Sequence, residues 1–390
     1  MNLKNYTKLN KLKFSFILMT LFYTIAFTAF IIGCSADTNE ETLNAMPLRS
    51  DSEVKNKTNN NSTSCSNSQV AENTLNILYS DPPTLDPHIA QDSTSASIIL
   101  ELYSGLVSLD TDLKITPDLA ESWKISDDGM KYTFIIRDNI KFHNGKKITA
   151  SDIVWSFNRA ADPKTASITA KDYLSDIIGV TEVINGKATT ISGIKEIDDR
   201  TIEINIDSPK AYFLAKLTYP VAFILDQESL SDPNWIQKPN GSGPFILDEY
   251  LVGEKLILKR NDNWHKTAAK LDYVSMNLAG GSAMAMYENC EIDITGVGMS
   301  DLERVLDPSS ELNNDVVVAP LDFSQYYIGF NLKEPPFDDI YFRQALAYSI
   351  NKELIATEVL SDLVKPAYNI LPPGFPGYNE NVKGFKFDEQ

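Results

Sequence analysis

Histidine and cysteine are scarce in this chain, whose 390 residues include only three of each. The histidines are His88, His143 and His265. None lies four residues from another, so no pair shares a helix face in the manner of HExxH zinc ligands. Cys34, Cys65 and Cys290 also lack the spacing of a metal cluster or a disulfide framework. We therefore expect no metal site, and we expect Cys290 to be a small buried apolar residue.

The chain also lacks a recognisable catalytic motif. Ser282 lies in a Gly-Gly-Ser-Ala-Met run and misses the second glycine of a GxSxG nucleophile elbow. The glycine-rich loop 240–245 has no following lysine that would mark a phosphate-binding loop. Adjacent aspartates occur at turns and helix starts, where a carboxylate bonds locally instead of converging with another. We expect no catalytic residue and no cofactor.

Basic residues are outnumbered, with 35 Lys and Arg against 53 Asp and Glu and a formal charge of −18. The first 33 residues hold four lysines and no acid, so the remainder is more acidic still, with 31 basic residues against 53 acidic ones. Such a balance excludes nucleic acid as a natural partner and suits a solvated surface.

The amino-terminal residues have the pattern of an export signal. Four lysines precede residues 14–32, which carry no charge. By length this apolar run also suits a transmembrane helix. The sequence Ile31-Ile32-Gly33-Cys34 resembles a bacterial lipobox, in which a small residue precedes a cysteine that becomes lipidated. We predict a signal peptide at residues 1–33 and a lipid anchor on Cys34.

A polar spacer is expected at residues 34–73. From residue 35 on, Ser, Thr and Asn make up about half of it, and it contains no aromatic residue. It therefore cannot bury enough apolar surface to offset its chain entropy. We expect a disordered tether between the lipid and the folded part.

Residues 74–390 contain short segments in which apolar residues recur with either the period of a strand or the period of a helix. Alternation predicts strands, and i, i+3, i+4 spacing predicts helices. The expected strands are 75–79, 131–137, 191–197, 201–206, 255–260, 271–278, 292–294, 316–318 and 326–330. The expected helices are 94–103, 210–218, 282–287 and 340–350, and a further helix is expected to begin at Thr149, its N-cap, with Asp152 three residues later. The irregular order indicates an α/β fold, and about 317 residues are enough for more than one lobe.

Aromatic residues offer the most plausible binding groups in the chain. Tyr326 and Tyr327 lie on one of the expected strands, so their side chains should point to opposite faces. One is expected in the core, and the other suits either a ligand cleft or a plain structural role.

An ordered series of short motifs resembles the family 5 extracellular solute-binding proteins, the peptide and nickel receptors of ABC importers. Residues 117–153 carry the signature region, with a turn at 127–129, a strand at 131–137 and a second turn at 144–145. Cys290 replaces the glycine that usually precedes the Glu-Ile-Asp motif of the family. The other motifs, in chain order, are Leu85-Asp86-Pro87, Tyr103-Ser104-Gly105-Leu106, Gly243-Pro244-Phe245, Leu258-Lys259-Arg260-Asn261, Glu291-Ile292-Asp293, Pro335-Pro336-Phe337-Asp338-Asp339, Arg343-Gln344-Ala345-Leu346 and Leu371-Pro372-Pro373-Gly374.

The resemblance implies a bilobal clamshell of the periplasmic-binding-protein type, with an extra subdomain in the first lobe. The first lobe would span residues 74–270, and residues 271–390 would form part of the second lobe. Family members continue beyond the final motif, so the second lobe is expected to be incomplete. Whether the chain is a fragment or the product of a truncated gene stays open.

By the same resemblance the protein is a monomeric, non-enzymatic receptor that captures a peptide or another small solute and delivers it to the transmembrane subunits of an ABC permease. It would be held by lipid at the outer face of the cytoplasmic membrane, or in the periplasm of a two-membrane host. Two alternatives stay open. One is a surface lipoprotein with an adhesive or structural role, including a receptor that has lost its ligand, and the other is a secreted hydrolase.

Candidate ligand-binding residues follow from the resemblance by position. Gln91, Asp92 and Ser93 follow the Leu-Asp-Pro motif, and Thr169 lies near a position that often holds tyrosine in the peptide receptors. This departure leaves peptide length and fit open. The full set of candidates is Gln91, Asp92, Ser93, Thr169, Gly243, Tyr326 and Tyr327.

Overall fold

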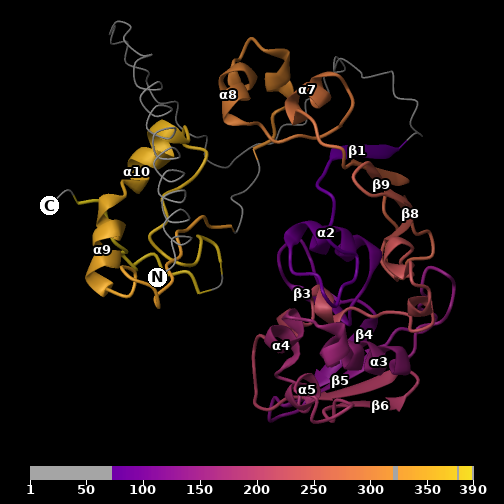
Figure 1. The fold of residues 1–390 in the computed structure, drawn as a ribbon. Coiled ribbons are helices and arrows are strands. Elements are labelled where there is room, and N and C mark those ends of the chain that lie inside the picture. Colours follow the sequence, from indigo (N-terminus) through magenta and orange to yellow (C-terminus); the bar gives the residue numbers. More distant parts are fainter. Residues whose placement is uncertain (1–72, 319–323, 376, 389–390) are drawn as a thin grey trace, which may run out of the picture. The chain divides into compact units, whose positions relative to one another are not determined.

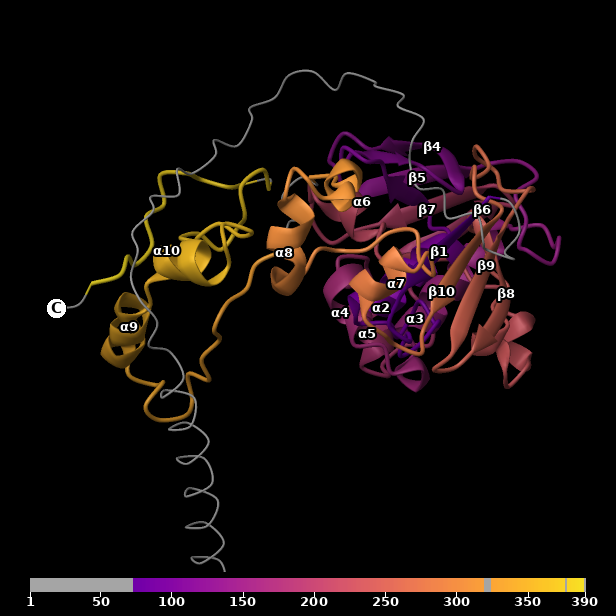
Figure 2. The same ribbon diagram turned by 90° about the horizontal axis from the view of Figure 1, so that it is seen from above.

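Two four-stranded sheets organise the part of the chain that the computed structural model describes, residues 73–318, 324–375 and 377–388. The first sheet has the order β1-β10-β9-β8, and Figure 2 shows these strands side by side. Its members are β1 (Thr74–Leu78), β8 (Phe245–Leu251), β9 (Lys255–Arg260) and β10 (Tyr273–Asn277). Only β1 and β10 run parallel, and the other pairs are antiparallel. Strand β1 therefore pairs with a strand nearly 200 residues later in the chain.

The second sheet is wholly antiparallel, with the order β4-β5-β7-β6. Its strands are β4 (Ala120–Ile125), β5 (Lys131–Ile136), β6 (Ile194–Asp198) and β7 (Thr201–Asn205). A short hairpin, β2 (Val107–Leu109) with β3 (Ile115–Pro117), precedes it. The expected hairpin around residues 198–200 is confirmed by the pairing of β6 with β7.

The helices are short and lie between these strands. Figure 1 shows α3, α4 and α5 gathered beside β4, β5 and β6. The described α-helices are α2 (Ser93–Leu102), α3 (Ala150–Ala161), α4 (Thr169–Leu174), α5 (Val180–Ile184), α6 (Phe213–Lys216), α7 (Ala283–Glu288), α8 (Met299–Leu306), α9 (Ile340–Ser349) and α10 (Lys352–Leu354). The single turns are η1 (Pro163–Thr165), η2 (Pro220–Ala222), η3 (Ser229–Ser231), η4 (Trp235–Gln237), η5 (Glu311–Asp315) and η6 (Ile355–Val359).

Each sheet has its own hydrophobic core. The face of the first sheet that carries Leu256 and Leu258 packs against α2, whose Ile98, Ile99 and Leu102 are fully buried. The second sheet packs against α3, with Phe134 and Phe157 at the centre of a larger cluster. Each of these side chains contributes about 1.5–3 kcal/mol by leaving water. These two cores fix the ends of α2 and α3, which carry the residues discussed below.

Several predicted helix starts are confirmed in detail. Thr149 caps α3 in a reciprocal capping box with Asp152. Asp339 caps α9, accepting a hydrogen bond of 2.7 Å from the amide of Tyr341. The helix expected at 210–218 is shorter than predicted, because only Phe213–Lys216 is α-helical.

Some sequence expectations are wrong. Residues 316–318 and 326–330 form no strand, and in 292–294 only Ile294 makes a bridge, to Ile77. Alternating β-branched and aromatic residues make a strand only where a partner strand supplies hydrogen bonds. Cys290 is exposed, not buried, and is disulfide-bonded. It follows α7 in a left-handed conformation (φ 61°) that places it in a surface turn.

Candidate functional site

A buried ion pair anchors the segment that leads to the candidate residues. The carboxylate of Asp86 accepts hydrogen bonds from both terminal nitrogens of Arg159 on α3, at 3.1 and 2.7 Å. The side chains are 4% and 17% exposed. A fork of this kind is short and directional. The segment before α2 is thereby fastened to α3.

His88 completes this anchor in its neutral form. Its Nε2 lies 3.0 Å from the carbonyl oxygen of Phe223, and its Nδ1 lies 2.9 Å from Arg159. Arginine only donates, so Nδ1 accepts and Nε2 carries the proton. Burial, followed by the charge of Arg159, lowers the pKa of His88 to about 4.

Asp92 forms the N-cap of α2. Its carboxylate accepts a hydrogen bond of 2.7 Å from the amide of Ser95. Gln91 and Ser93, on either side, are exposed. The anchored loop therefore presents three consecutive polar residues at the start of a helix whose other side is in the core.

A stacked pair of tyrosines lies beside this helix start. The rings of Tyr173 and Tyr219 are 3.9 Å apart with an angle of 11° between their planes. Tyr219 immediately precedes η2, which contacts both α2 and α4. Burial raises the pKa of Tyr219, and the charge of Asp92 raises it further. Thr169 is buried at the start of α4, one turn before Tyr173.

Gly243 lies at the opposite end of α2. Its amide donates to the carbonyl oxygen of Leu102 at 3.0 Å, and its own carbonyl accepts from Asn261 Nδ2 at 2.9 Å. A Cβ atom at this position would lie 2.5 Å from the Glu101 carbonyl oxygen and 2.6 Å from the Leu102 carbonyl carbon. Only glycine allows the loop to approach the helix end so closely.

Replacing Gly243 with alanine should destabilise the protein by about 2 kcal/mol, because the added methyl group meets rigid backbone. The change would appear as a lower midpoint in urea denaturation. Gly296→Ala is the matched control, since nothing lies within 4 Å of a Cβ atom built there. Equal midpoints for the two variants would contradict the steric argument.

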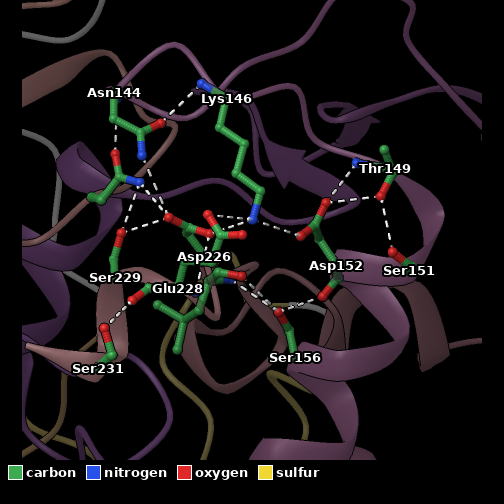
Figure 3. Close-up of polar contacts among 12 residues, drawn as sticks. Asn144, Lys146, Thr149, Ser151, Asp152, Ser156, Asp226, Glu228, Ser229 and Ser231 are labelled. Atoms are coloured by element: carbon green, nitrogen blue, oxygen red, sulfur yellow. Dashed lines mark hydrogen bonds and ion pairs between the residues drawn. The ribbon is translucent and has the colours of Figure 1, made fainter.

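A polar network fixes the loops around Gly243 (Figure 3). Lys146 Nζ lies 2.7 Å from Asp226, 3.6 Å from Glu228 and 3.8 Å from Asp152 at the start of α3. Asn240 Nδ2 donates to Asp226 at 2.9 Å, and its Oδ1 accepts from the amide of Asn144 at 2.9 Å. Burial opposes ionisation of Asp226, but hydrogen bonds from Lys146, Ser229 and Asn240 hold its pKa below the usual value. The network holds the segments that carry Lys146, Asp226 and Asn240 together.

The sequence candidates therefore divide into three groups. Gln91, Asp92 and Ser93 lie together at the start of α2, and η2 contacts both α2 and α4, the helix that begins at Thr169. Gly243 lies at the far end of α2, where its role is packing. Tyr326 and Tyr327 are 94% and 83% exposed, so the expectation that one of them is a core residue is wrong.

Other predictions concern residues outside the described ones. The signal peptide at residues 1–33, the lipidated Cys34 and all of the tether at 34–73 except its last residue, Asn73, lie outside the described residues. Within the described ranges no helix is long and apolar enough to cross a bilayer. The same residues contain no cluster of three His, Cys, Asp or Glu side chains placed to hold a metal ion.

The sequence interpretation missed the stacked tyrosines. Tyr173 lies four residues after Thr169, so helical spacing alone places it one turn away on the same side. Tyr219 lies 46 residues further along the chain. No local pattern signals their contact, since it depends on how η2 packs against α4.

Comparison with known proteins gives consistent matches. Residues 114–390 match the model of the middle region of the bacterial extracellular solute-binding proteins, family 5. The chain is 33% identical over 322 residues to the probable deoxycholate-binding periplasmic protein YgiS of Escherichia coli, covering 80% of this chain and 58% of YgiS. It is 31% identical over 304 residues to the periplasmic oligopeptide-binding protein OppA of E. coli, covering 75% of this chain and 55% of OppA.

Solved structures agree. The murein tripeptide-binding protein MppA of E. coli superposes with a TM-score of 0.70 at 30% identity, covering 79% of this chain and 62% of MppA. OppA of Haemophilus influenzae, in complex with the peptide RPPGFSPFR, gives 0.67 at 26% identity, covering 78% of this chain and 61% of that protein. The mixed α/β fold is thus that of the periplasmic peptide-binding proteins. The chain spans a little over half the length of the curated relatives that it matches.

Proposed function

Because the chain belongs to family 5 of the bacterial extracellular solute-binding proteins, a family of binding proteins and not of enzymes, we propose that it is the substrate-binding receptor of an ABC importer. Its ligand is a peptide, which it delivers to the transmembrane subunits of the permease. Ligand favours a closed state because both lobes contact it only there.

The observation that carries this proposal is the surface at the start of α2. Gln91, Asp92 and Ser93 are held in place by the buried Asp86–Arg159 pair, and the half-buried tyrosine stack adjoins them. Rigid polar groups beside aromatic rings suit a ligand with both apolar parts and hydrogen-bonding groups. Thr169 supports this surface from α4, and Gly243 supports it from the far end of α2. Tyr326 and Tyr327 supply aromatic contacts from the second lobe.

The domain limits predicted from the sequence belong to the same proposal. Residues 1–33 are a signal peptide, Cys34 carries the lipid, and residues 34–73 are the tether. The sequence predicts that the first lobe spans residues 74–270 and that residues 271–390 belong to the second. Because β10 (Tyr273–Asn277) completes the sheet of β1, β8 and β9, we place the limit after β10. The receptor works as a monomer outside the cytoplasmic membrane.

Peptide binding should raise the thermal stability of the purified chain by mass action. A ligand at 100 times its dissociation constant stabilises by about 2.7 kcal/mol, which corresponds to a rise of about 4 °C in Tm for a protein of this size. The measurement is a thermal shift with a panel of di-, tri- and pentapeptides. Deoxycholate serves as the competing ligand, because a relative is named for it. A shift with deoxycholate and with no peptide would replace the peptide proposal.

A further inference from the structure

The surroundings of the tyrosine stack are negatively charged. Asp92 caps α2, and Tyr219 immediately precedes η2, which contacts both α2 and α4. Asp172 precedes Tyr173 on α4. Burial, the neighbouring Tyr219 and the charge of Asp172 all raise the pKa of Tyr173. Both phenols therefore stay neutral at physiological pH with a carboxylate close to each. We call these four residues the acidic tyrosine site.

Neither carboxylate is neutralised within the described part of the chain. The only hydrogen bond of the Asp92 side chain there is the cap to the Ser95 amide, and Asp172 makes no ion pair with a described basic residue. Lys171, next to Asp172, is exposed and bonds to neither carboxylate. Lys216, three residues before Tyr219, is held 2.8 Å from Asp176. The charge of the site is thus left for an external partner.

The tyrosines leave their polar ends free as well. Both rings are half-buried against the larger core, yet neither hydroxyl makes a hydrogen bond to a described residue. Fixed aromatic rings attract a cation by their quadrupole, worth about 0.5–2 kcal/mol according to its desolvation. A nearby carboxylate adds a charge-assisted hydrogen bond to an ammonium or guanidinium group.

An anionic ligand is disfavoured at the same place. The start of α2 would attract an anion through its unpaired amides, but the carboxylate of Asp92 already occupies the cap. A second negative charge would be repelled by Asp92 and Asp172 together. The chain as a whole is also strongly acidic.

We propose that the acidic tyrosine site selects ligands that carry a cationic side chain, so that peptides containing lysine or arginine bind in preference to neutral or acidic ones. The stacked rings form the wall against which the methylene stem lies, and Asp92 and Asp172 bind the charged end. This inference rests on the proposed function and names the class of peptide for that same surface.

The test is calorimetric titration of the full chain with three kinds of tripeptide and with deoxycholate. A lysine scan (Lys-Ala-Ala, Ala-Lys-Ala and Ala-Ala-Lys) is compared with Ala-Ala-Ala, with the matching glutamate scan, and with deoxycholate. We expect at least one lysine peptide to bind about tenfold more tightly than Ala-Ala-Ala, and the glutamate peptides to bind more weakly than it.

The decisive variant is the double substitution Asp92→Asn and Asp172→Asn. Asparagine still caps α2, so the fold is kept while both charges are removed. The ratio of the affinity for the best lysine peptide to the affinity for Ala-Ala-Ala should fall from about tenfold to less than twofold. Asp199→Asn, on the exposed turn between β6 and β7, removes a charge elsewhere and should keep the preference.

The two proposals fail in different ways. Equal affinity of the wild-type chain for lysine, alanine and glutamate peptides overturns the cation selectivity and leaves the receptor proposal standing. An undiminished lysine preference in the double variant also overturns the role of the acidic tyrosine site. Binding of no peptide in the panel overturns the receptor proposal together with the inference built on it.

Discussion

Replacing Arg159 with methionine should lower the free energy of unfolding by about 3–5 kcal/mol, because it leaves the buried charge of Asp86 without a partner. The Asp86 carboxylate is 4% exposed, so water cannot take the place of the guanidinium. Nδ1 of His88 would lose its donor in the same step. The methionine stem keeps most of the volume of arginine, so the loss reports the missing charge and hydrogen bonds more than a cavity.

Urea denaturation followed by far-UV circular dichroism measures this loss. Lys114→Met is the matched control, since Lys114 pairs with Asp112 at 3.4 Å with both side chains more than 70% exposed. An exposed pair contributes about 0–1 kcal/mol. If both variants lost the same stability, the buried pair would not be the anchor described above.

Most local structure around this anchor is predictable from the sequence. Thr149 and Asp152 predict the start of α3, and the Asp-Asp-Arg turn predicts the hairpin β6–β7. Both are predictable because the groups that form the hydrogen bonds lie within a few residues of each other in the chain. The alternation at residues 255–260 correctly predicts β9, in which Leu256 and Leu258 are buried and Lys255 and Ile257 are partly buried.

The anchor itself is not predictable in this way. Asp86 belongs to a recognisable motif, but its partner Arg159 lies 73 residues later in the chain. The stack of Tyr173 on Tyr219 depends likewise on packing between separate elements. Strand prediction failed at 326–330 for a related reason, since a strand needs a partner that its own sequence does not specify. The sequence thus predicted Gln91, Asp92 and Ser93 as candidates, but it did not predict the ion pair and the tyrosine stack that surround them.

Acid should destabilise the protein steeply between pH 6.5 and about 4, through His88 and His143. Burial is the main cause that lowers the pKa of each to about 4 in the folded protein, whereas the unfolded chain has the ordinary value of 6.5. Below pH 6.5 the two histidines therefore bind protons in the unfolded chain but stay neutral in the folded protein. Their stabilising contribution is complete above pH 6.5 and is lost as pH falls toward 4, by about 3 kcal/mol for each histidine.

The hydrogen bonds explain why neither ring accepts a proton. Protonation of His88 would place N–H against the guanidinium of Arg159, which has no acceptor to offer. In His143, Nε2 donates to the carbonyl oxygen of Gly243 at 3.3 Å, and Nδ1 is buried without a partner. A second proton there would be an unsatisfied buried charge.

Urea midpoints measured from pH 7.5 to pH 4.5 test this prediction, because titrating carboxylates act equally in wild type and variants. Glutamine at position 88 can still accept from Arg159 and donate to Phe223 but does not titrate. His88→Gln should therefore remove about half of the histidine-linked slope of stability against pH, whatever its own cost at pH 7.5. His143→Gln should remove the other half, and the double variant should retain only the carboxylate slope. An unchanged slope in the double variant would mean that the acid sensitivity comes from the carboxylates alone. The neutral state of His88 beside the Asp86–Arg159 pair would then contribute nothing to the dependence of stability on pH.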